Sequence, residues 1–398
     1  MLVLAIVFWL CAALIVWTQV GYAAALALLA RALPSPHGER GAPQHQPAQD
    51  LPPLSLIVAA HDEETVIAAR VANALALDYP RELLEVIVSC DGCTDATAAR
   101  ARGAGADLVL ELPRGGKIRA QDAAVERSRG ELVAFSDANA LWHADAAREL
   151  VRAFADPRVG YACGQVRYTS AHLAGQADAV AAGGGANQEG VYWRYELAVR
   201  ALESRLSSVT AGNGAIYATR RESYVVVDPI MGHDLSLPFN IVKRGLRAVY
   251  VPSAISTEKM VPSIGGEFAR KRRMMSHTWP IVLRGGMLSP RGYTPGYALM
   301  ILSHRLLRYA TPALHALALA ANVALVLLAG GTTQVLYGVT LALQLALLAG
   351  AALAGALPLR PLLIARYYVL TTASLAGGLW DWLAHGTSAS WEAAEGTR

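Results

Sequence analysis

The chain has 398 residues, of which 54% are hydrophobic and 17% charged, and its formal net charge is +4. Soluble domains carry roughly 25% charged residues, and the deficit here is local, because residues 1–30 and 309–359 contain no Asp, Glu, Lys or Arg. This pattern predicts a membrane protein with one polar domain between apolar ends. It excludes a disordered or collagen-like chain, and the mild charge argues against nucleic acid as a partner.

The first apolar segment, residues 1–32, is expected to be a transmembrane anchor. It is longer than the roughly 20 residues that cross a bilayer. The alternative is a cleaved signal peptide, but the segment lacks a basic start. Residues 33–53 follow with six prolines, which predicts a flexible linker.

Residues 54–290 are expected to form one α/β domain. Short apolar runs predict buried strands at 54–60, 84–89, 107–112 and 132–136. Helical spacing predicts helices between them, over 63–76, 95–102 and 117–128. Such alternation favours a parallel sheet with right-handed crossovers, in which ligands bind beyond the carboxyl ends of the strands.

Polar side chains follow all four predicted strands. The four segments are His61-Asp62-Glu63-Glu64, Cys90-Asp91-Gly92-Cys93, Arg114-Gly115-Gly116-Lys117 and Asp137-Ala138-Asn139. One acidic strand end is usually a helix cap, whereas four at one border of a sheet favour a ligand site. The sequence lacks the glycine motifs of P-loop ATPases and dinucleotide dehydrogenases. A diphosphate bound without such a loop is usually neutralised by a divalent cation, for which Asp137 and Asn139 supply oxygen ligands.

Cys90 and Cys93 have the spacing of half a metal or redox motif. The sequence offers no second Cys or His pair with suitable spacing. We therefore expect the spacing of these two cysteines to be coincidental.

The remaining chain is expected to return to the membrane. Residues 291–308 form an interfacial segment, 309–386 hold transmembrane helices and 387–398 form a tail. Three spans fit, at about 309–330, 333–357 and 362–385. The last span contains Arg366 and Asp381, so an interfacial helix is the alternative there.

Basic residues beside the spans predict the orientation. Arg31 and Arg40 after the first span, Arg305 and Arg308 before the second, and Arg360 and Arg366 between the third and fourth all lie on one side if the polar domain is cytoplasmic. The chain is therefore expected to be an integral protein of the cytoplasmic membrane with its polar domain in the cytoplasm. The N-terminus and the tail would lie on the opposite side.

Several motifs, taken together, resemble a known family. LSLIVAAHDEE, SCDGCTD, GGKIRAQDAAVERSRGELVAFSDAN and the later Asp234 resemble the membrane-bound family 2 glycosyltransferases. This family includes cellulose, chitin, hyaluronan and poly-N-acetylglucosamine synthases and ceramide glucosyltransferases. The resemblance covers about residues 54–285. It implies a GT-A (Rossmann-like) α/β catalytic domain with one N-terminal and about three C-terminal transmembrane helices.

The resemblance also implies a reaction and its requirements. An inverting transferase of this kind moves a hexosyl or N-acetylhexosaminyl group from a nucleotide-sugar donor, commonly a UDP-sugar, to an acceptor. The acceptor would be a lipid or a glycan at the membrane, and Mg²⁺ or Mn²⁺ would be the cofactor. The alternatives are a catalytically inactive subunit that binds nucleotide sugars and a processive polysaccharide synthase.

The resemblance assigns roles to five residues. Asp91 occupies the position that contacts the donor base, and Lys117 aligns with a lysine near the donor. Asp137 begins the Asp-x-Asp motif, whose last residue, here Asn139, coordinates the metal. Asp234 matches the catalytic base, which removes the proton of the acceptor hydroxyl.

Two further segments, and His233, depart from the family pattern or have an alternative role. Arg270 and Arg273 stand at the spacing of the Gln-x-x-Arg-Trp motif of processive synthases, but Gln and Trp are missing, which disfavours processive polymerisation. These arginines are expected to clamp the donor diphosphate, or alternatively to contact anionic lipid. Gly212-Asn213-Gly214 corresponds to glycine-rich segments that line the acceptor pocket, and a turn is the alternative. His233 replaces the acid expected before the base.

Overall fold

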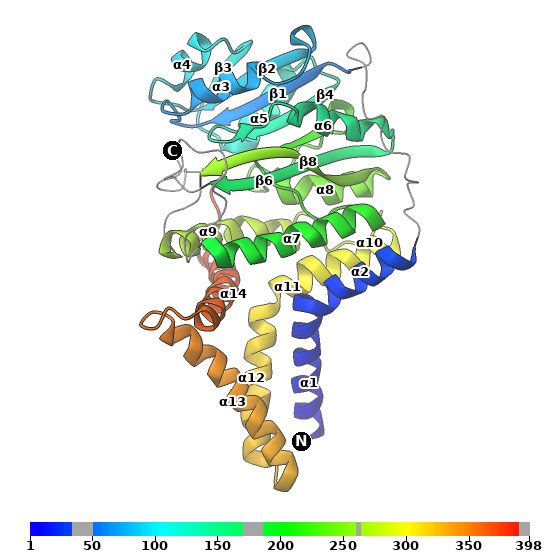
Figure 1. The fold of residues 1–398 in the computed structure, drawn as a ribbon, viewed down its shortest axis with the longest axis vertical. Coiled ribbons are helices and arrows are strands. Elements are labelled where there is room, and N and C mark those ends of the chain that lie inside the picture. The colour runs from blue at the N-terminus through cyan, green and yellow to red at the C-terminus, as the bar shows by residue number, and fades with distance from the viewer. Residues whose placement is uncertain (34–50, 170–185, 260–263, 390–398) are drawn as a thin grey trace.

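The computed structural model describes residues 1–33, 51–169, 186–259 and 264–389. Most of the predicted linker over 33–53 and of the tail over 387–398 lies outside these residues. In the described part, an α/β domain lies above a group of long apolar helices (Figure 1).

An eight-stranded mixed sheet forms the centre of the α/β domain, in the order β3-β2-β1-β4-β7-β6-β8-β5. The strands are β1 Leu54–Ala60, β2 Leu84–Asp91, β3 Leu108–Leu112, β4 Leu132–Asp137, β5 Leu141–Trp142, β6 Val159–Thr169, β7 Tyr217–Arg220 and β8 Arg247–Lys259. β1 to β4 are parallel, as predicted. Beyond them β7 runs antiparallel to both β4 and β6, while β6 runs parallel to β8, so the second half of the sheet is mixed and differs from the predicted all-parallel arrangement.

Helices cover both faces of the sheet, which is why β1 and β2 are buried along their whole length. The helices of the domain are α3 Ile67–Leu75, α4 Thr97–Gly103, α5 Lys117–Arg127, α6 Ala146–Arg152, α7 Ala186–Leu206, α8 His233–Lys243 and α9 Ile264–Leu283. Alternate strand residues point to opposite faces. Ile57 belongs to the core that includes α5 and α8, whereas its neighbours Leu56 and Val58 belong to the cores beside α6 and α3.

Short one-turn segments connect several of these elements. They are η3 Arg81–Leu83, η4 Ala153–Ala155 and η6 Arg221–Ser223. The interfacial segment expected over 291–308 contains α10 Pro295–Met300, the π-helical turn η7 Ile301–Leu306 and the start of α11 Leu307–Tyr309.

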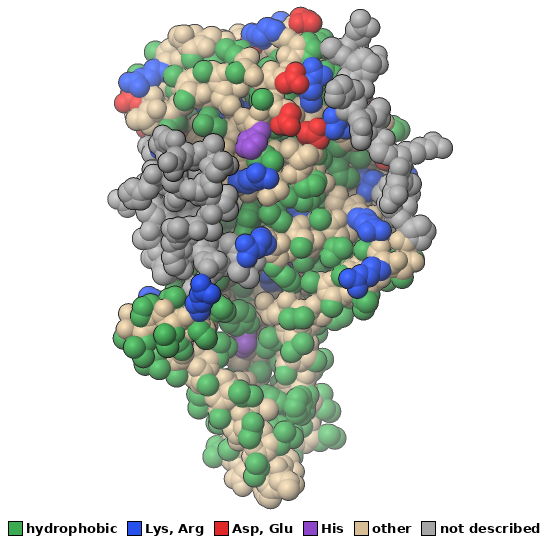
Figure 2. Space-filling model, in the orientation of Figure 1, with side chains coloured by type: hydrophobic (Ala, Val, Ile, Leu, Met, Phe, Trp, Pro, Cys, Tyr) green, Lys and Arg blue, Asp and Glu red, His purple; other side chains and the backbone are tan. Residues whose placement is uncertain are grey.

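Within the part of the chain that the structure describes, four helices are long and apolar enough to span a membrane: Leu2–Ala32, Thr311–Leu328, Gly331–Leu353 and Arg360–His385. The first comprises α1 Leu2–Val16, the π-helical turn η1 Trp17–Gly21 and α2 Tyr22–Ala32; the others are α12, α13 and α14. The chain changes direction at η1, so that α1 runs beside α12 while α2 lies under the α/β domain (Figure 1). Figure 2 shows hydrophobic side chains covering the lower part of the molecule, where α1, α12 and α13 lie.

Helix α14 packs across α9 of the α/β domain. Arg272 donates two hydrogen bonds to Asp381, at 2.6 and 2.7 Å, and the Trp279 indole donates to the Leu375 carbonyl. Beyond α14, Thr387 bonds to the Ser276 carbonyl at 2.9 Å. The expectation that the tail starts on the side opposite the polar domain is therefore wrong. The contacts between α14 and α9 lead residues 387–389 back to the domain.

A buried network of charged groups joins α2 and η7 to the α/β domain. The Tyr22 hydroxyl donates to Glu203 of α7 at 2.7 Å, and the ring of His304 lies 2.7 Å from the same carboxylate. Arg308 pairs with Glu196, which precedes Glu203 in the same helix α7. Glu203 is fully buried, so these partners compensate the cost of placing its charge away from water.

Candidate active site

The strand ends that carry polar residues lie side by side in the structure. β1 lies between β2 and β4, with Ala60 in register with Cys90 and Ala59 in register with Asp137. The residues after these strands therefore meet at one border of the sheet, which we call the rim. The rim gathers segments that are up to about 80 residues apart in the sequence, as expected for a parallel sheet.

Asp91 ends β2 and holds the loop that leads into α5. Its carboxylate is 1% exposed and accepts the backbone N–H groups of Gly115 at 2.6 Å and Gly116 at 3.0 Å. Arg114 lies 3.8 Å from the same carboxylate. Gly116 has a φ of 98°, a left-handed conformation that favours glycine. Asp91 thus fixes the position from which Lys117 begins α5.

Lys117 and Asp137 form an ion pair at the centre of the rim. Burial acts to lower the pKa of Lys117, but the nearby carboxylates outweigh it and raise the pKa above its usual value. Gly214 leaves the space beside this pair open, because a Cβ there would lie 3.5 Å from the Lys117 ammonium nitrogen. Asn139 lies half-buried in the turn two residues beyond Asp137.

Asp234 approaches the same pair from α8. Burial raises the pKa of its carboxyl group, and the charge of Asp137 adds to this, whereas Lys117 acts in the opposite direction. The backbone carbonyl of Asp234 accepts the N–H of Gly212 at 2.7 Å. The glycine loop and Asp234 are therefore held together, and Asp234 lies within electrostatic range of the ion pair.

Glu258 is a fourth ionisable member of the site that the sequence reasoning missed. It lies on β8, and burial together with the charge of Asp137 raises its pKa to about 7, while Lys117 and Arg270 act to lower it. Its sequence neighbours carry no recognisable motif. The available signal was its place near the end of a strand, which becomes informative only once β8 is known to lie in the same sheet.

The tyrosines around His233 form a hydrogen-bonded chain beneath Asp234. Tyr224 donates to Asp122 at 2.6 Å, so its oxygen is left to accept from Nε2 of His233, 3.2 Å away. Nδ1 of His233 then accepts from the Tyr217 hydroxyl at 3.0 Å. Burial, and then the charge of Lys117, lower the pKa of His233 to about 3, so the ring is neutral. A neutral histidine stands where the family has an acid, and each of its ring nitrogens is hydrogen-bonded to a tyrosine hydroxyl.

The remaining predicted site residues are placed as follows. Arg270 of α9 lies within electrostatic range of Glu258, and Arg273 is exposed about one turn further along the same helix. Asn213 turns inward, where its amide donates to the Gly164 carbonyl at 2.7 Å and its oxygen accepts from Ile216. Gly212 packs so closely on the Tyr161 hydroxyl that a side chain would collide with it. The loop at 212–214 is thus a tight turn as well as part of the site.

The residues at the rim fit a divalent cation. Asp137, Asp234 and Glu258 bring three carboxyl groups around one lysine, and the mutual repulsion of these groups contributes to the raised pKa values of Asp234 and Glu258. Carboxylate and amide oxygens are the ligands that Mg²⁺ and Mn²⁺ prefer. Asp137 at the end of β4 and Asn139 in the turn after it each offer such an oxygen.

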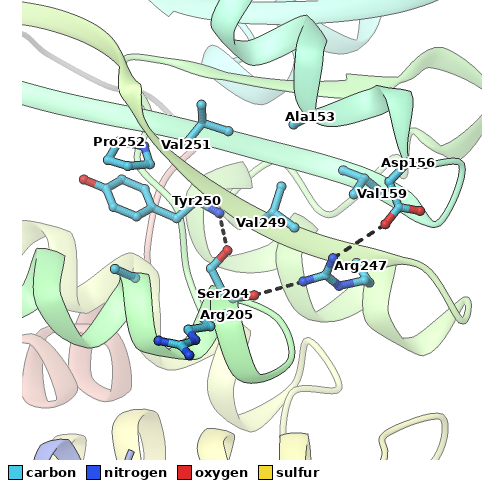
Figure 3. A pocket seen from close by; sticks show the side chains of 11 residues that line it. Ala153, Asp156, Val159, Ser204, Arg205, Arg247, Val249, Tyr250, Val251 and Pro252 are labelled. Atoms are coloured by element: carbon cyan, nitrogen blue, oxygen red, sulfur yellow. Dashed lines mark hydrogen bonds and ion pairs between the residues drawn. The ribbon is translucent and has the colours of Figure 1, made fainter. Parts of the chain in front are cut away.

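A hollow lies away from the rim. It has a volume of about 450 Å³ and is lined by residues of β6, β8, α7 and the turn after α6 (Figure 3). Arg247 in its wall is paired with Asp156 at 3.7 Å and donates to the Ser204 carbonyl at 2.9 Å. Arg247 and Asp156 neutralise each other there, and the hollow contains none of the rim residues, so the rim remains the candidate site.

The fold and the site define a mixed α/β, GT-A-like protein with acids, a lysine and a glycine loop at the carboxyl ends of its parallel strands. The family model described as "Glycosyltransferase like family 2" matches residues 52–276, more than half of the chain. The chain therefore belongs to glycosyltransferase family 2.

Individual relatives are similar over part of their length. An N-acetylglucosaminyltransferase of Rhizobium sp. (strain N33) is 28% identical over 42% of this chain and 38% of its own length. A beta-monoglucosyldiacylglycerol synthase of Synechocystis sp. (strain ATCC 27184 / PCC 6803 / Kazusa) is 34% identical over 27% of this chain and 24% of its own. The chain spans between 24% and 59% of the length of the curated relatives it matches.

One solved structure is similar over nearly the whole chain. It is a mannosyltransferase from Pyrobaculum calidifontis in complex with GDP-Man and Mn²⁺, with a TM-score of 0.70, 23% identity, and coverage of 96% of this chain and 99% of that one. At this identity the likeness concerns the fold. It extends over the α/β domain and the apolar helices together.

Proposed function

We propose that this protein is an inverting glycosyltransferase that moves a sugar from a nucleotide-sugar donor, of the UDP-sugar kind, to a lipid or glycan acceptor at the membrane. The observation that carries the proposal is the convergence of Lys117, Asp137 and Asp234 at one rim, with the chain's membership of family 2. Asp91 and Lys117 hold the donor, and Arg270 and Arg273 bind its diphosphate from α9.

The residues divide the reaction between them. Asp234 takes the proton of the acceptor hydroxyl while that oxygen forms a bond to the anomeric carbon, and the bond from this carbon to the diphosphate breaks. Lys117 and the arginines neutralise the charge that develops on the departing diphosphate. Asp137 and Asn139 hold Mg²⁺ or Mn²⁺, which when bound supplies further positive charge to the diphosphate. The glycine loop at 212–214, held on Asp234, borders the acceptor.

The four candidate spans support a membrane location, with the α/β domain in the cytoplasm because the flanking basic residues favour that side. An acceptor in the lipid phase suits this arrangement, since α2 and η7 bind the α/β domain directly to the apolar helices. Single transfer is favoured over chain extension because the Gln-x-x-Arg-Trp motif is incomplete.

The decisive experiment compares Asp234→Asn with the wild type and with Asp228→Asn, which makes the same change at an exposed aspartate. Membranes containing each protein receive a panel of labelled nucleotide sugars with Mn²⁺, and products are separated into lipid and polymer fractions. We expect transfer by the wild type and the control, and loss of transfer with retained donor binding in Asp234→Asn. Wild-type turnover in Asp234→Asn would contradict the assignment. Donor binding without transfer or hydrolysis by the wild type would favour a catalytically inactive subunit.

A further inference from the structure

A second group of potential metal ligands lies at the ends of β1 and β2. Ligand atoms of His61, Asp62 and Cys93 all lie within 4.8 Å of one another, and all three residues are half-buried. The Cys93 thiol also contacts the thiol of Cys90. The sequence alone shows only the two cysteines; the parallel pairing of β1 with β2 adds a histidine and an aspartate to them.

The hydrogen bond made by His61 defines which ring nitrogen faces the group. Nδ1 lies 2.8 Å from the backbone carbonyl of Asp91, and a carbonyl only accepts, so Nδ1 carries the proton. Nε2 of the ring lies 3.6 Å from Oδ2 of Asp62. The two groups form an ion pair when the ring is protonated, and they present two lone pairs to one cation when the ring is neutral. Histidines that bind metals commonly donate their other N–H to a carbonyl in this manner.

The Asp62 carboxylate is held in a matching way. Its Oδ1 accepts the backbone N–H of Thr94 at 2.7 Å, and the Thr94 hydroxyl lies 3.3 Å from both Oδ1 and Oδ2, so Thr94 orients the carboxylate while Oδ2 faces His61. The Cys93 sulfur lies 3.5 Å from the carbonyl of Ala60, the residue that precedes His61. A nitrogen, an oxygen and a sulfur donor thus converge, and two of them are oriented by backbone hydrogen bonds.

We propose that His61, Asp62 and Cys93 bind a thiophilic divalent cation of the Zn²⁺ kind, at a site separate from Asp137 and Asn139. A thiolate and an imidazole favour Zn²⁺ over Mg²⁺ and Mn²⁺. Ligand atoms around tetrahedral Zn²⁺ lie about 3.4 Å apart, close to the 3.6 Å between His61 and Asp62. Water fills the fourth position, and the Cys93 thiol releases its proton on binding. Metal binding here does not require the transferase reaction, although the site adjoins Asp91, which we assign to the donor.

Cobalt provides the test, because Co²⁺ occupies zinc sites and its bond to a thiolate gives a near-ultraviolet charge-transfer band. Full-length protein in detergent, freed of metal and supplied with excess Mg²⁺, is titrated with Co²⁺ and then with Zn²⁺. We expect one Co²⁺ per chain, a thiolate band, and loss of that band when Zn²⁺ is added. Cys93→Ser removes the band, whereas Cys163→Ser, a buried cysteine elsewhere in the sheet, and Asp137→Asn retain it.

The ligand set has an independent check that does not require removal of the thiol. Asp62→Asn keeps the oxygen that accepts from Thr94, and His61→Asn keeps a polar side chain; each should raise the Kd for Co²⁺ about 10-fold or more. Thermal unfolding without metal shows whether each variant is folded. Absence of a thiolate band in the wild type, a band that survives Cys93→Ser, or unchanged affinity in both the Asp62 and His61 variants would overturn the proposal.

Discussion

Lys117 and Asp137 form an ion pair although they are 20 residues apart in the sequence, at the first residue of α5 and the last residue of β4. The pair is the centre on which Asp234 and Glu258 converge. In this state Lys117 occupies the carboxylate that we assign to the metal. Arrival of a divalent cation would therefore release Lys117 to bind the donor diphosphate.

The ion pair leads to a prediction with two opposite effects. Lys117→Met removes a positive charge that competes for Asp137, so Mn²⁺ binding without donor should become tighter. The same change removes a charged hydrogen bond to the diphosphate, worth about 1.5–3 kcal/mol, and should raise the Kd for the donor roughly 10- to 100-fold. Calorimetric titrations with Mn²⁺ alone and with donor measure both effects. Arg273→Met is the matched control for donor binding alone, and weaker binding of both ligands in Lys117→Met would contradict the exchange of partners.

Glu258 predicts how metal binding depends on pH. Its pKa is about 7, so the side chain is largely neutral at pH 6 and largely ionised at pH 8. The ionised form adds negative charge beside Asp137. Mn²⁺ affinity should therefore rise with pH across this range, by at most about tenfold per pH unit for one linked proton. Glu258→Gln should flatten the profile, while Glu222→Gln, at an exposed position, should leave it unchanged. Equal wild-type affinities at pH 6 and 8 would show that Glu258 does not contribute.

Asp234 sets the direction of the pH dependence of turnover. Its pKa is raised above the usual range by burial, and only the ionised carboxylate can accept a proton. Turnover should therefore fall as the pH is lowered from neutral. Because the pKa is raised, this fall should begin at a higher pH than an exposed aspartate would require. A rate measured at saturating donor and Mn²⁺ tests this, and an acid limb that remains unchanged in Asp234→Glu would argue against this carboxylate as the base.

Local sequence patterns were sufficient for the first half of the sheet and for the apolar helices. Leu54–Ala60 is a short apolar run with polar residues at its end, and its strand has the predicted bounds. The mixed half was harder to predict because β6, β7 and β8 pair with strands that are distant in the sequence. Their order depends on tertiary packing, which local periodicity does not predict.

The candidate active site could likewise be predicted only in part. The strand-end positions of Asp91, Lys117 and Asp137 were visible in the sequence, because the ends of parallel strands meet at one border. Glu258 was missed because β8 reaches the rim from the mixed half of the sheet. The contact between Ala389 and Gly116 could not be anticipated either, since it follows from the way α14 crosses α9. Long-range packing, rather than local propensity, accounts for each omission.

The buried network at the junction predicts a large effect on stability. Burial acts to raise the pKa of Glu203, but His304 and Arg305 outweigh it and hold the pKa below its usual value. The stabilisation from this group is therefore present at pH values above the ordinary Glu pKa and is lost as the pH falls through the lower folded-state value. Glu203→Leu leaves its partners buried without their counter-charge and should cost about 3–5 kcal/mol. Tyr22→Phe removes one hydrogen bond to the carboxylate and should cost about 1.5–3 kcal/mol.

Thermal unfolding in detergent at neutral pH measures both junction variants. Glu222→Gln serves as the control, because Glu222 is exposed and lies outside the network. The order of stability should be wild type, then Tyr22→Phe, then Glu203→Leu. If Glu203→Leu were as stable as the control, the network would not hold the apolar helices to the α/β domain.

The segment after α14 lies against the loop that begins α5. A side chain at Gly116 would collide with the Ala389 carbonyl, and the segment is held by bonds from Thr387 to Ser276 and between His277 and the Ser388 carbonyl at 3.2 Å. Gly116 immediately precedes Lys117, where we place the donor diphosphate. If the diphosphate binds at Lys117 as proposed, this segment competes with the donor for the same space.

Deletion of residues 387–398 should lower the donor KM without lowering kcat. If the segment covers the site in about nine of ten molecules, its removal should tighten apparent donor binding about tenfold, because the competent fraction rises to one. Replacing Thr387 and His277 with alanine weakens the same attachment without shortening the chain, and it should shift KM in the same direction by a smaller factor. The comparison of the two variants separates release of the rim from a general effect of truncation. An increased KM in the deletion variant would instead mean that the segment helps to bind the donor, because removing a competitor can only favour the occupied state.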